Sequence, residues 1–98
     1  MKWVVTYHKD VEKDLKSLGS FAAKRILRAI DTKLTQAPLE FGDPLTGNLA
    51  ALRKLRVGDY RVVYQVTNHQ VVVYVLAVGP RRDKEIYNAA GKRTSENS

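Results

Sequence analysis

The segment from Val71 to Val78 constrains the fold most, because all eight of its residues are apolar. Successive side chains of a β-strand point to opposite faces of the sheet, so a strand that is apolar throughout needs cover on both faces. Helices can cover one face, and a further element must cover the other. The segment therefore predicts a central strand that is buried on both sides.

Two shorter apolar-rich segments, Leu52–Val57 and Tyr60–Val66, precede the last strand, which is expected to span residues 70–78. Gly58-Asp59 separates the first two segments, and Thr67-Asn68-His69 separates the second from the third. Both separators have compositions that suit hairpin turns. An antiparallel meander of three strands is therefore expected in this half of the chain.

The amino-terminal half changes from strand-like to helical spacing. Residues 4–7 alternate weakly between apolar and polar, which is typical of a short strand, and residues 9–18 carry apolar side chains at helical spacing. Gly19 ends this first helix, and Ser20 is expected as the N-cap of a second helix that must end before Pro38. The two helices should form a hairpin.

The remaining segments connect these elements or end the chain. Residues 38–48 contain two prolines and two glycines and predict an ordered surface loop, whereas residues 83–90 suit a short helix and residues 91–98 a polar, flexible tail. A chain of 98 residues has room for one core. We therefore expect a single domain over residues 1–90 with the order β-α-α-β-β-β-α, an α+β fold whose helix hairpin packs on a small, mainly antiparallel sheet.

The charge of the chain predicts a polyanionic partner. Seventeen Lys and Arg residues against ten Asp and Glu residues give a net charge of +7, and residues 52–98, with nine basic and four acidic groups, carry +5 of it. From charge alone, a basic surface that aids solubility or docks an acidic protein stays open. The chain contains no cysteine, which excludes disulfides and a cysteine nucleophile. The amino end lacks the apolar core of a secretory signal, so a cytoplasmic protein is expected.

Basic side chains gather on one face of the predicted sheet. Strand alternation places Lys54 and Arg56 on one face and Arg53 on the other. Arg61 follows a tight turn, and Arg81-Arg82 leave the last strand, so these cations can meet at one end of the sheet. Such a face can position phosphates through charge-assisted hydrogen bonds, although a merely solvated basic surface remains an alternative.

Other candidate catalytic groups are few. The acidic residues are scattered without ligand-like spacing, so neither a metal site nor any other cofactor is expected. His8 and His69 are expected to be ordinary surface histidines rather than general bases. Tyr87 follows the basic stretch 79–86, where its phenol could stack on a base or transfer a proton, or could simply pack a terminal helix.

The residues LRVGDYRVVYQV (55–66), VVVYVLAVGPRRD (71–83) and Ile86-Tyr87 resemble the RelE branch of the RelE/ParE toxin superfamily. The resemblance implies the toxin of a bacterial type II toxin–antitoxin pair, a metal-independent endoribonuclease that enters the A site of the 70S ribosome and cuts the messenger RNA there. It also implies a cognate antitoxin that silences the toxin by wrapping around it, and a complex that binds its operator DNA through the antitoxin. No membrane partner is implied.

The family's working residues are carried over only where this chain matches them. One departure is Leu52, which stands where relatives often have a further lysine; Arg53 would substitute only if the strand bulges. The resemblance implies four catalytic residues, Lys54, Arg61, Arg81 and Tyr87, and four residues that bind RNA or the ribosome, Arg53, Arg56, Arg82 and Lys84.

The implied chemistry is attack of a ribose 2′-hydroxyl on the adjacent phosphorus, with Arg61 and Arg81 stabilising the charge that develops. A neutral Lys54 or an ionised Tyr87 is the candidate base, and the sequence leaves both open. Two other functions also remain open: a ParE-type toxin that inhibits DNA gyrase and cuts nothing, and an inactive relative that only binds an antitoxin.

Overall fold

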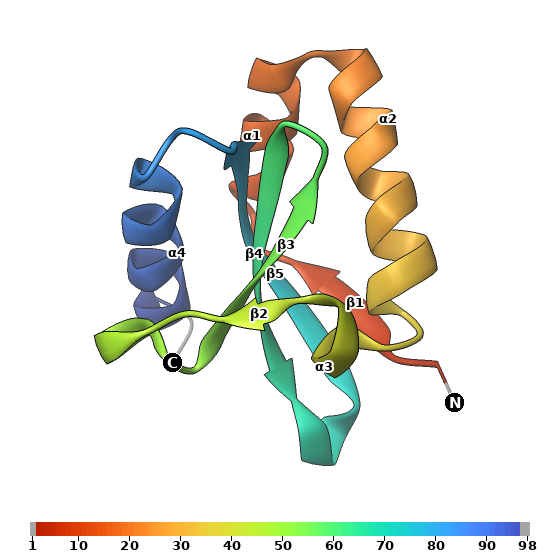
Figure 1. Cartoon of the computed structure of the whole chain (residues 1–98), viewed down its shortest axis with the longest axis vertical. Coiled ribbons are helices and arrows are strands. Elements are labelled where there is room, and N and C mark those ends of the chain that lie inside the picture. Colours follow the sequence, from red (N-terminus) through yellow and green to blue (C-terminus); the bar gives the residue numbers. More distant parts are fainter. Residues whose placement is uncertain (1, 97–98) are drawn as a thin grey trace.

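The computed structural model describes residues 2–96 of the chain and contains a five-stranded sheet with helices on both faces (Figure 1). In chain order the elements are β1 (Val4–Tyr7), α1 (Val11–Leu18), α2 (Ser20–Ala29) with a π-helical continuation (Ile30–Leu34), α3 (Pro38–Phe41), β2 (Asp43–Pro44), a 3₁₀ turn (Gly47–Leu49), β3 (Leu52–Val57), β4 (Tyr60–Thr67), a 3₁₀ turn (Asn68–Gln70), β5 (Val72–Pro80) and α4 (Glu85–Glu96). The predicted α+β class and the predicted meander are confirmed.

The strands lie in the order β1-β5-β4-β3-β2, and β1 is parallel to β5 whereas the other neighbours are antiparallel. The turn between β3 and β4 passes through Gly58, which adopts a left-handed conformation with φ of 58°. Between β4 and β5 the register shifts, because Val63 pairs with Ala77 and Tyr64 pairs with Val75. This shift leaves Leu76 without a partner in β4, as in a β-bulge.

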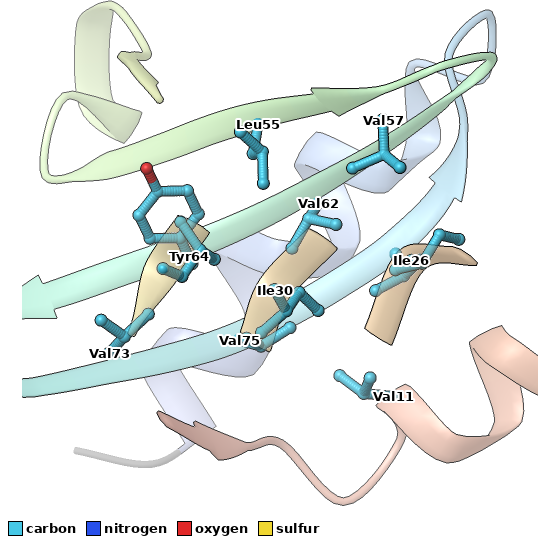
Figure 2. Packing of buried hydrophobic residues seen from close by; sticks show 11 residues of the cluster. Val11, Ile26, Ile30, Leu55, Val57, Val62, Tyr64, Val73 and Val75 are labelled. Carbon is cyan, nitrogen blue, oxygen red and sulfur yellow. The ribbon is translucent and has the colours of Figure 1, made fainter. Parts of the chain in front are cut away.

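One face of the sheet packs against the hairpin of α1 and α2, and we call it the hairpin face. Figure 2 shows Val62, Tyr64 and Val75 of this face packing towards Ile26 and Ile30 of the helical layer. α4 lies on the opposite side of the sheet (Figure 1), and we call that side the α4 face. β5 contributes buried residues to both faces, so the prediction of a strand covered on both sides is confirmed, and α4 is the second cover.

The carboxyl end differs from the prediction. α4 continues six residues beyond Ala90, to Glu96, so the predicted polar tail is wrong for residues 91–96. Tertiary contacts stabilise this extension: the Arg93 guanidinium pairs with Asp14 of α1, and the Thr94 hydroxyl donates to Gln65 of β4 at 2.9 Å. Asn97 and Ser98 lie outside the described residues.

Three local predictions also differ. α2 begins at Ser20 itself with no side-chain capping hydrogen bond, because Gly19 occupies the cap position with φ of 94°. Part of the predicted surface loop over residues 38–48 forms α3 and the short edge strand β2. His8 is buried rather than on the surface, and its Nδ1 accepts a hydrogen bond from the Asp10 N–H at 3.1 Å. Within residues 2–96 no helix is long and apolar enough to cross a membrane.

Candidate functional site

α4 covers only part of its face of the sheet, and cations occupy the end of β3 and β4 near their turn. Arg56 and Arg61 lie directly opposite each other in the β3–β4 register. Like charges at such a position destabilise a sheet, so a partner with negative charge is favoured here. On its other side Arg61 pairs with Gly79 of β5, which has no side chain to occupy the space.

Arg61 contacts a phenol that α4 supplies. Its Nη1 donates a hydrogen bond to the Tyr87 hydroxyl oxygen, and its guanidinium carbon lies 5.9 Å from the centroid of the Tyr87 ring. Both side chains are half-buried. A guanidinium that donates to an aromatic hydroxyl and lies within cation–π distance of the ring is restrained in its orientation, with its remaining N–H groups available to an anion.

Lys54 lies on the same face as Arg56, two residues earlier on β3. In register it pairs with Val63 of β4 and with Asp43 of the edge strand β2. Strand geometry separates Lys54 from Arg56 by about 7 Å along β3, and places Lys54 diagonally across from Arg61. The predicted division of β3 between the two faces is confirmed for these cations.

Arg81, Arg82 and Lys84 lie beyond the end of β5 and are exposed. The Arg81 N–H donates to the Asp59 carbonyl at 2.7 Å, which fixes the start of this segment beside the turn between β3 and β4. Arg81 and Arg82 line an open groove of about 550 Å³ with Asp59, Tyr60 and Pro80. Lys84 stands at the amino end of α4, where its carbonyl accepts a hydrogen bond from the Tyr87 N–H.

The structure does not bring Arg53 to this basic face. Its Nη2 donates to the carbonyls of Leu39 at 2.9 Å and Gly42 at 2.6 Å, so it holds the α3 segment against the hairpin face. The β3–β4 register is unbroken, and the bulge that would let Arg53 replace the missing lysine is absent. Leu52 is buried beneath α4, so the lysine of relatives has an apolar core residue in its place here.

Tyr64 is a tyrosine of β4, and its burial sets it apart from Tyr87. It is fully buried on the hairpin face, and its hydroxyl donates to the Pro38 carbonyl at 2.7 Å. Burial raises the pKa of Tyr64 above its usual value, and the neighbouring Arg53 opposes that shift only in part. Tyr64 therefore keeps its proton and lies out of reach of substrate, whereas the half-buried Tyr87 lies in contact with Arg61.

Two features of the site were not predicted. A groove of about 770 Å³ runs beside Tyr87 between α4 and the segment before β3, and its polar lining includes Asn48, Gln65 and Asn88. The Arg25 guanidinium of α2 lies against Gly58, so a side chain at position 58 would collide with it. The groove depends on the extension of α4, and Arg25 reaches the turn only through tertiary packing, so neither has a local sequence signal. Across residues 2–96, no three histidine or acidic side chains gather in a group that could hold a metal ion.

Known proteins are similar to this chain in sequence and in fold. The family model described as "ParE toxin of type II toxin-antitoxin system, parDE" matches residues 5–85. The mRNA interferase toxin RelE of Escherichia coli K12 is 31% identical over 94 residues, which cover 95% of this chain and 98% of the relative. A free-state mutant of E. coli toxin RelE superposes with a TM-score of 0.76 at 30% identity, covering 95% of this chain and 98% of that one. The toxin–antitoxin complex RelBE2 of Mycobacterium tuberculosis gives 0.78 at 26% identity, covering 83% and 100%.

The chain is a small α+β protein in which a helix hairpin and a terminal helix cover opposite faces of one sheet, and these comparisons show that it is of the toxin class. The chain belongs to the ParE toxin family of type II toxin–antitoxin systems, and within that superfamily to the RelE branch.

Proposed function

We propose that this protein is the toxin of a type II toxin–antitoxin pair and cuts messenger RNA in the ribosomal A site without a metal ion. One observation carries the proposal: the hydrogen bond from Arg61 to Tyr87, on a sheet face that also carries Lys54 and Arg56. A cation and a phenol held in contact on an open basic surface suit the charge and proton transfers of phosphodiester cleavage.

In the proposed reaction the ribose 2′ oxygen bonds to the adjacent phosphorus while its proton leaves, and the bond from phosphorus to the 5′ oxygen breaks as that oxygen takes a proton. The products are a 2′,3′-cyclic phosphate and a free 5′-hydroxyl. Arg61 and Arg81 stabilise the charge on the pentavalent phosphorus, the role that a metal ion has in other nucleases.

Lys54 and Tyr87 are the proposed proton carriers. Because the Tyr87 oxygen accepts a hydrogen bond from Arg61, its own proton points away from Arg61 and is available to a reacting oxygen. Lys54 lies on the same face and is the second carrier. The dependence of the cleavage rate on pH distinguishes their roles. In wild type the rate rises with pH as the base loses its proton and falls at higher pH as the acid loses its own. A variant that lacks the base should lose the rise, and a variant that lacks the acid should lose the fall.

The open site suits a substrate that another particle holds in place. The exposed cations Arg56, Arg82 and Lys84 bind RNA or ribosome phosphates in this proposal, and the ribosome orients the messenger strand. Because ribosomes are the proposed site of action, the cytoplasm is the proposed location of the protein. A cognate antitoxin is the second proposed partner, since the related RelBE2 structure is itself a toxin–antitoxin complex. An acidic segment that folds on binding fits this basic face, and the complex would bind operator DNA through the antitoxin.

The proposal is tested by adding the purified chain to translating ribosomes with a defined message and mapping new 5′ ends. We expect cuts within the A-site codon that need the ribosome and are lost in Arg81→Ala. Arg28→Ala is a matched control, because it removes the same charge from an exposed position on α2, away from the site. Cuts in free RNA, or equal cuts by both variants, would contradict the proposal.

Inhibition of DNA gyrase is the second candidate, because the matching family model carries the ParE description. A supercoiling assay with purified gyrase tests it. Inhibition of supercoiling without any RNA cut would support a ParE-type toxin, whereas neither activity would indicate a relative that only binds its antitoxin.

A further inference from the structure

We propose that Arg93 and Asp14 form a clamp that positions Tyr87 for catalysis; this inference rests on the proposed function. Arg93 Nη1 lies 2.7 Å from Asp14 Oδ2, and Arg93 Nη2 lies 3.2 Å from Asp14 Oδ1, a two-pronged ion pair between α4 and α1. The same atoms also contact β5: Arg93 Nη1 donates to the Leu76 carbonyl at 2.9 Å, and the Val78 N–H donates to Asp14 Oδ2 at 3.1 Å. Each partner therefore bonds both the other partner and the sheet.

The clamp occupies the place where a strand ends. β1 pairs with β5 only as far as Tyr7 opposite Val75, and the His8 N–H makes the last such contact, 2.9 Å from the Val75 carbonyl. Beyond this point β5 has no neighbouring strand on that side, and backbone groups there need other partners. Asp14 accepts from the Val78 N–H, and Arg93 donates to the Leu76 carbonyl. The ion pair thus takes the place of hydrogen bonds that a longer β1 would make with β5.

The two partners come from opposite sides of the sheet. α1 packs on the hairpin face and α4 on the other face, so the pair spans the sheet edge and ties both layers to β5 (Figure 1). The side chains of Arg93 and Asp14 are only 16% and 18% exposed. A charge in such a position is poorly solvated when its partner is removed, so the pair resists opening.

α4 needs this tether because its own buried surface is small. Among residues 85–95 the buried ones are Ile86 and Ala90, and Gly91 packs closely on Leu49. Tyr87 lies six residues before Arg93, about 9 Å along the helix axis. Ile86 thus anchors the Tyr87 end of α4, and the clamp anchors the far end together with the Thr94–Gln65 hydrogen bond. With the clamp lost, one neutral hydrogen bond holds the far end, so the helix can tilt and carry the phenol away from Arg61.

The first test compares Arg93→Gln with Lys16→Gln. Both variants lose one positive charge, but Lys16 pairs with Glu12 in a surface contact of 3.3 Å whose side chains are 75% and 77% exposed. With ribosomes in excess, we expect Arg93→Gln to cut the message about 10- to 100-fold more slowly, as expected for misplaced catalytic groups, while its ribosome affinity equals that of Lys16→Gln. Arg93→Lys keeps the charge and one donor and should recover part of the rate. Equal cleavage rates in Arg93→Gln and Lys16→Gln would overturn the proposal.

The second test does not depend on cleavage. The ¹³Cζ NMR signal of Tyr87, assigned with Tyr87→Phe, reports its contact with Arg61, and Arg61→Gln gives the position of the signal when the contact is lost. We expect Arg93→Gln to move the signal towards that position while the amide protons of β4 stay protected from exchange. An unmoved signal would overturn the clamp even if cleavage fell. If the wild-type chain cut no message, the proposed function would fail, and the signal would still decide whether the clamp positions Tyr87.

Discussion

The two faces of the sheet contrast in what covers them. On the hairpin face, large branched and aromatic side chains of α1, α2 and three strands are fully buried against one another (Figure 2). On the α4 face, one helix with few buried residues covers part of the sheet and leaves the turn end of β3 and β4 to cations. Because strand residues alternate between faces, the same strands stabilise the fold on one side and present charge on the other.

Two arginines on neighbouring strands illustrate this contrast. Arg53 and Arg61 are both half-buried, and they lie on opposite faces of the sheet. Arg53 donates to backbone carbonyls of the α3 segment, whereas Arg61 donates to the Tyr87 phenol. The first arginine holds a loop in place, and the second has N–H groups left for substrate. Residue type and burial alone therefore do not identify the functional arginine; the partners do.

The largest expected effect comes from breaking the hairpin face. Ile30 is fully buried there, so Ile30→Ala should lower the free energy of unfolding by about 4 kcal/mol, measured by urea denaturation. Cleavage per folded molecule should not change. Ile86→Ala opens a cavity on the α4 face and should lower the free energy of unfolding by less than Ile30→Ala does. It should nevertheless slow cleavage more, because Ile86 anchors the helix that carries Tyr87. The contrast between the faces would fail if both variants lost stability and activity in the same proportion.

Removing the central cation of the α4 face should have the next largest effect. Arg61→Ala should slow cleavage on saturated ribosomes about 100- to 1,000-fold, equivalent to about 3 kcal/mol of transition-state stabilisation. Its stability should change little, because the repulsion between Arg61 and Arg56 is relieved as the Tyr87 contact is lost. Arg28→Ala, with the same loss of charge, should cut at the wild-type rate, and slow cutting by that control would point to net charge as the cause.

Tyr64→Phe tests how the buried phenol of the hairpin face affects the pH dependence of stability. Burial raises the pKa of Tyr64 above 10.0, so near pH 10 the unfolded phenol ionises while the folded one keeps its proton. The stability that this phenol contributes is complete below pH 10 and is lost as the pH rises through the raised pKa. Tyr64→Phe should therefore cost about 1 kcal/mol at pH 7 through the lost hydrogen bond to Pro38, and should flatten the alkaline fall in stability.

Urea denaturation across pH 8–11 measures this fall. Tyr7→Phe is the companion variant, because burial and the nearby Asp31 raise the pKa of Tyr7 as well. Tyr7 is 41% exposed, so water screens much of that shift and the variant should flatten the curve less. A curve for Tyr64→Phe as steep as that of wild type would show that another group controls the alkaline transition.

Most strands and the division of β3 between faces could be predicted from the sequence, because both follow from local alternation and from the turn residues Gly58-Asp59. The structural role of Arg53 could not be predicted from the sequence. Its partners are carbonyls more than ten residues away, and only the folded α3 segment brings them near. Residues 91–96 are mostly polar, so the sequence alone predicts a flexible segment there. Their helix is stabilised by Asp14, which is 79 residues from Arg93 in sequence.

The smallest expected effect tests whether the cations at the end of β5 bind phosphate. Arg82 is exposed and makes its surroundings basic without contacting Tyr87, so Arg82→Gln should weaken ribosome binding only a few-fold. Loss of one phosphate contact with a single strand should reduce the slope of log affinity against log salt by about 0.7. Arg28→Gln removes an equal charge from the other layer and should leave that slope unchanged. Equal slopes in the two variants would mean that the protein attracts RNA through its net charge, and that the cations at the end of β5 make no contact of their own.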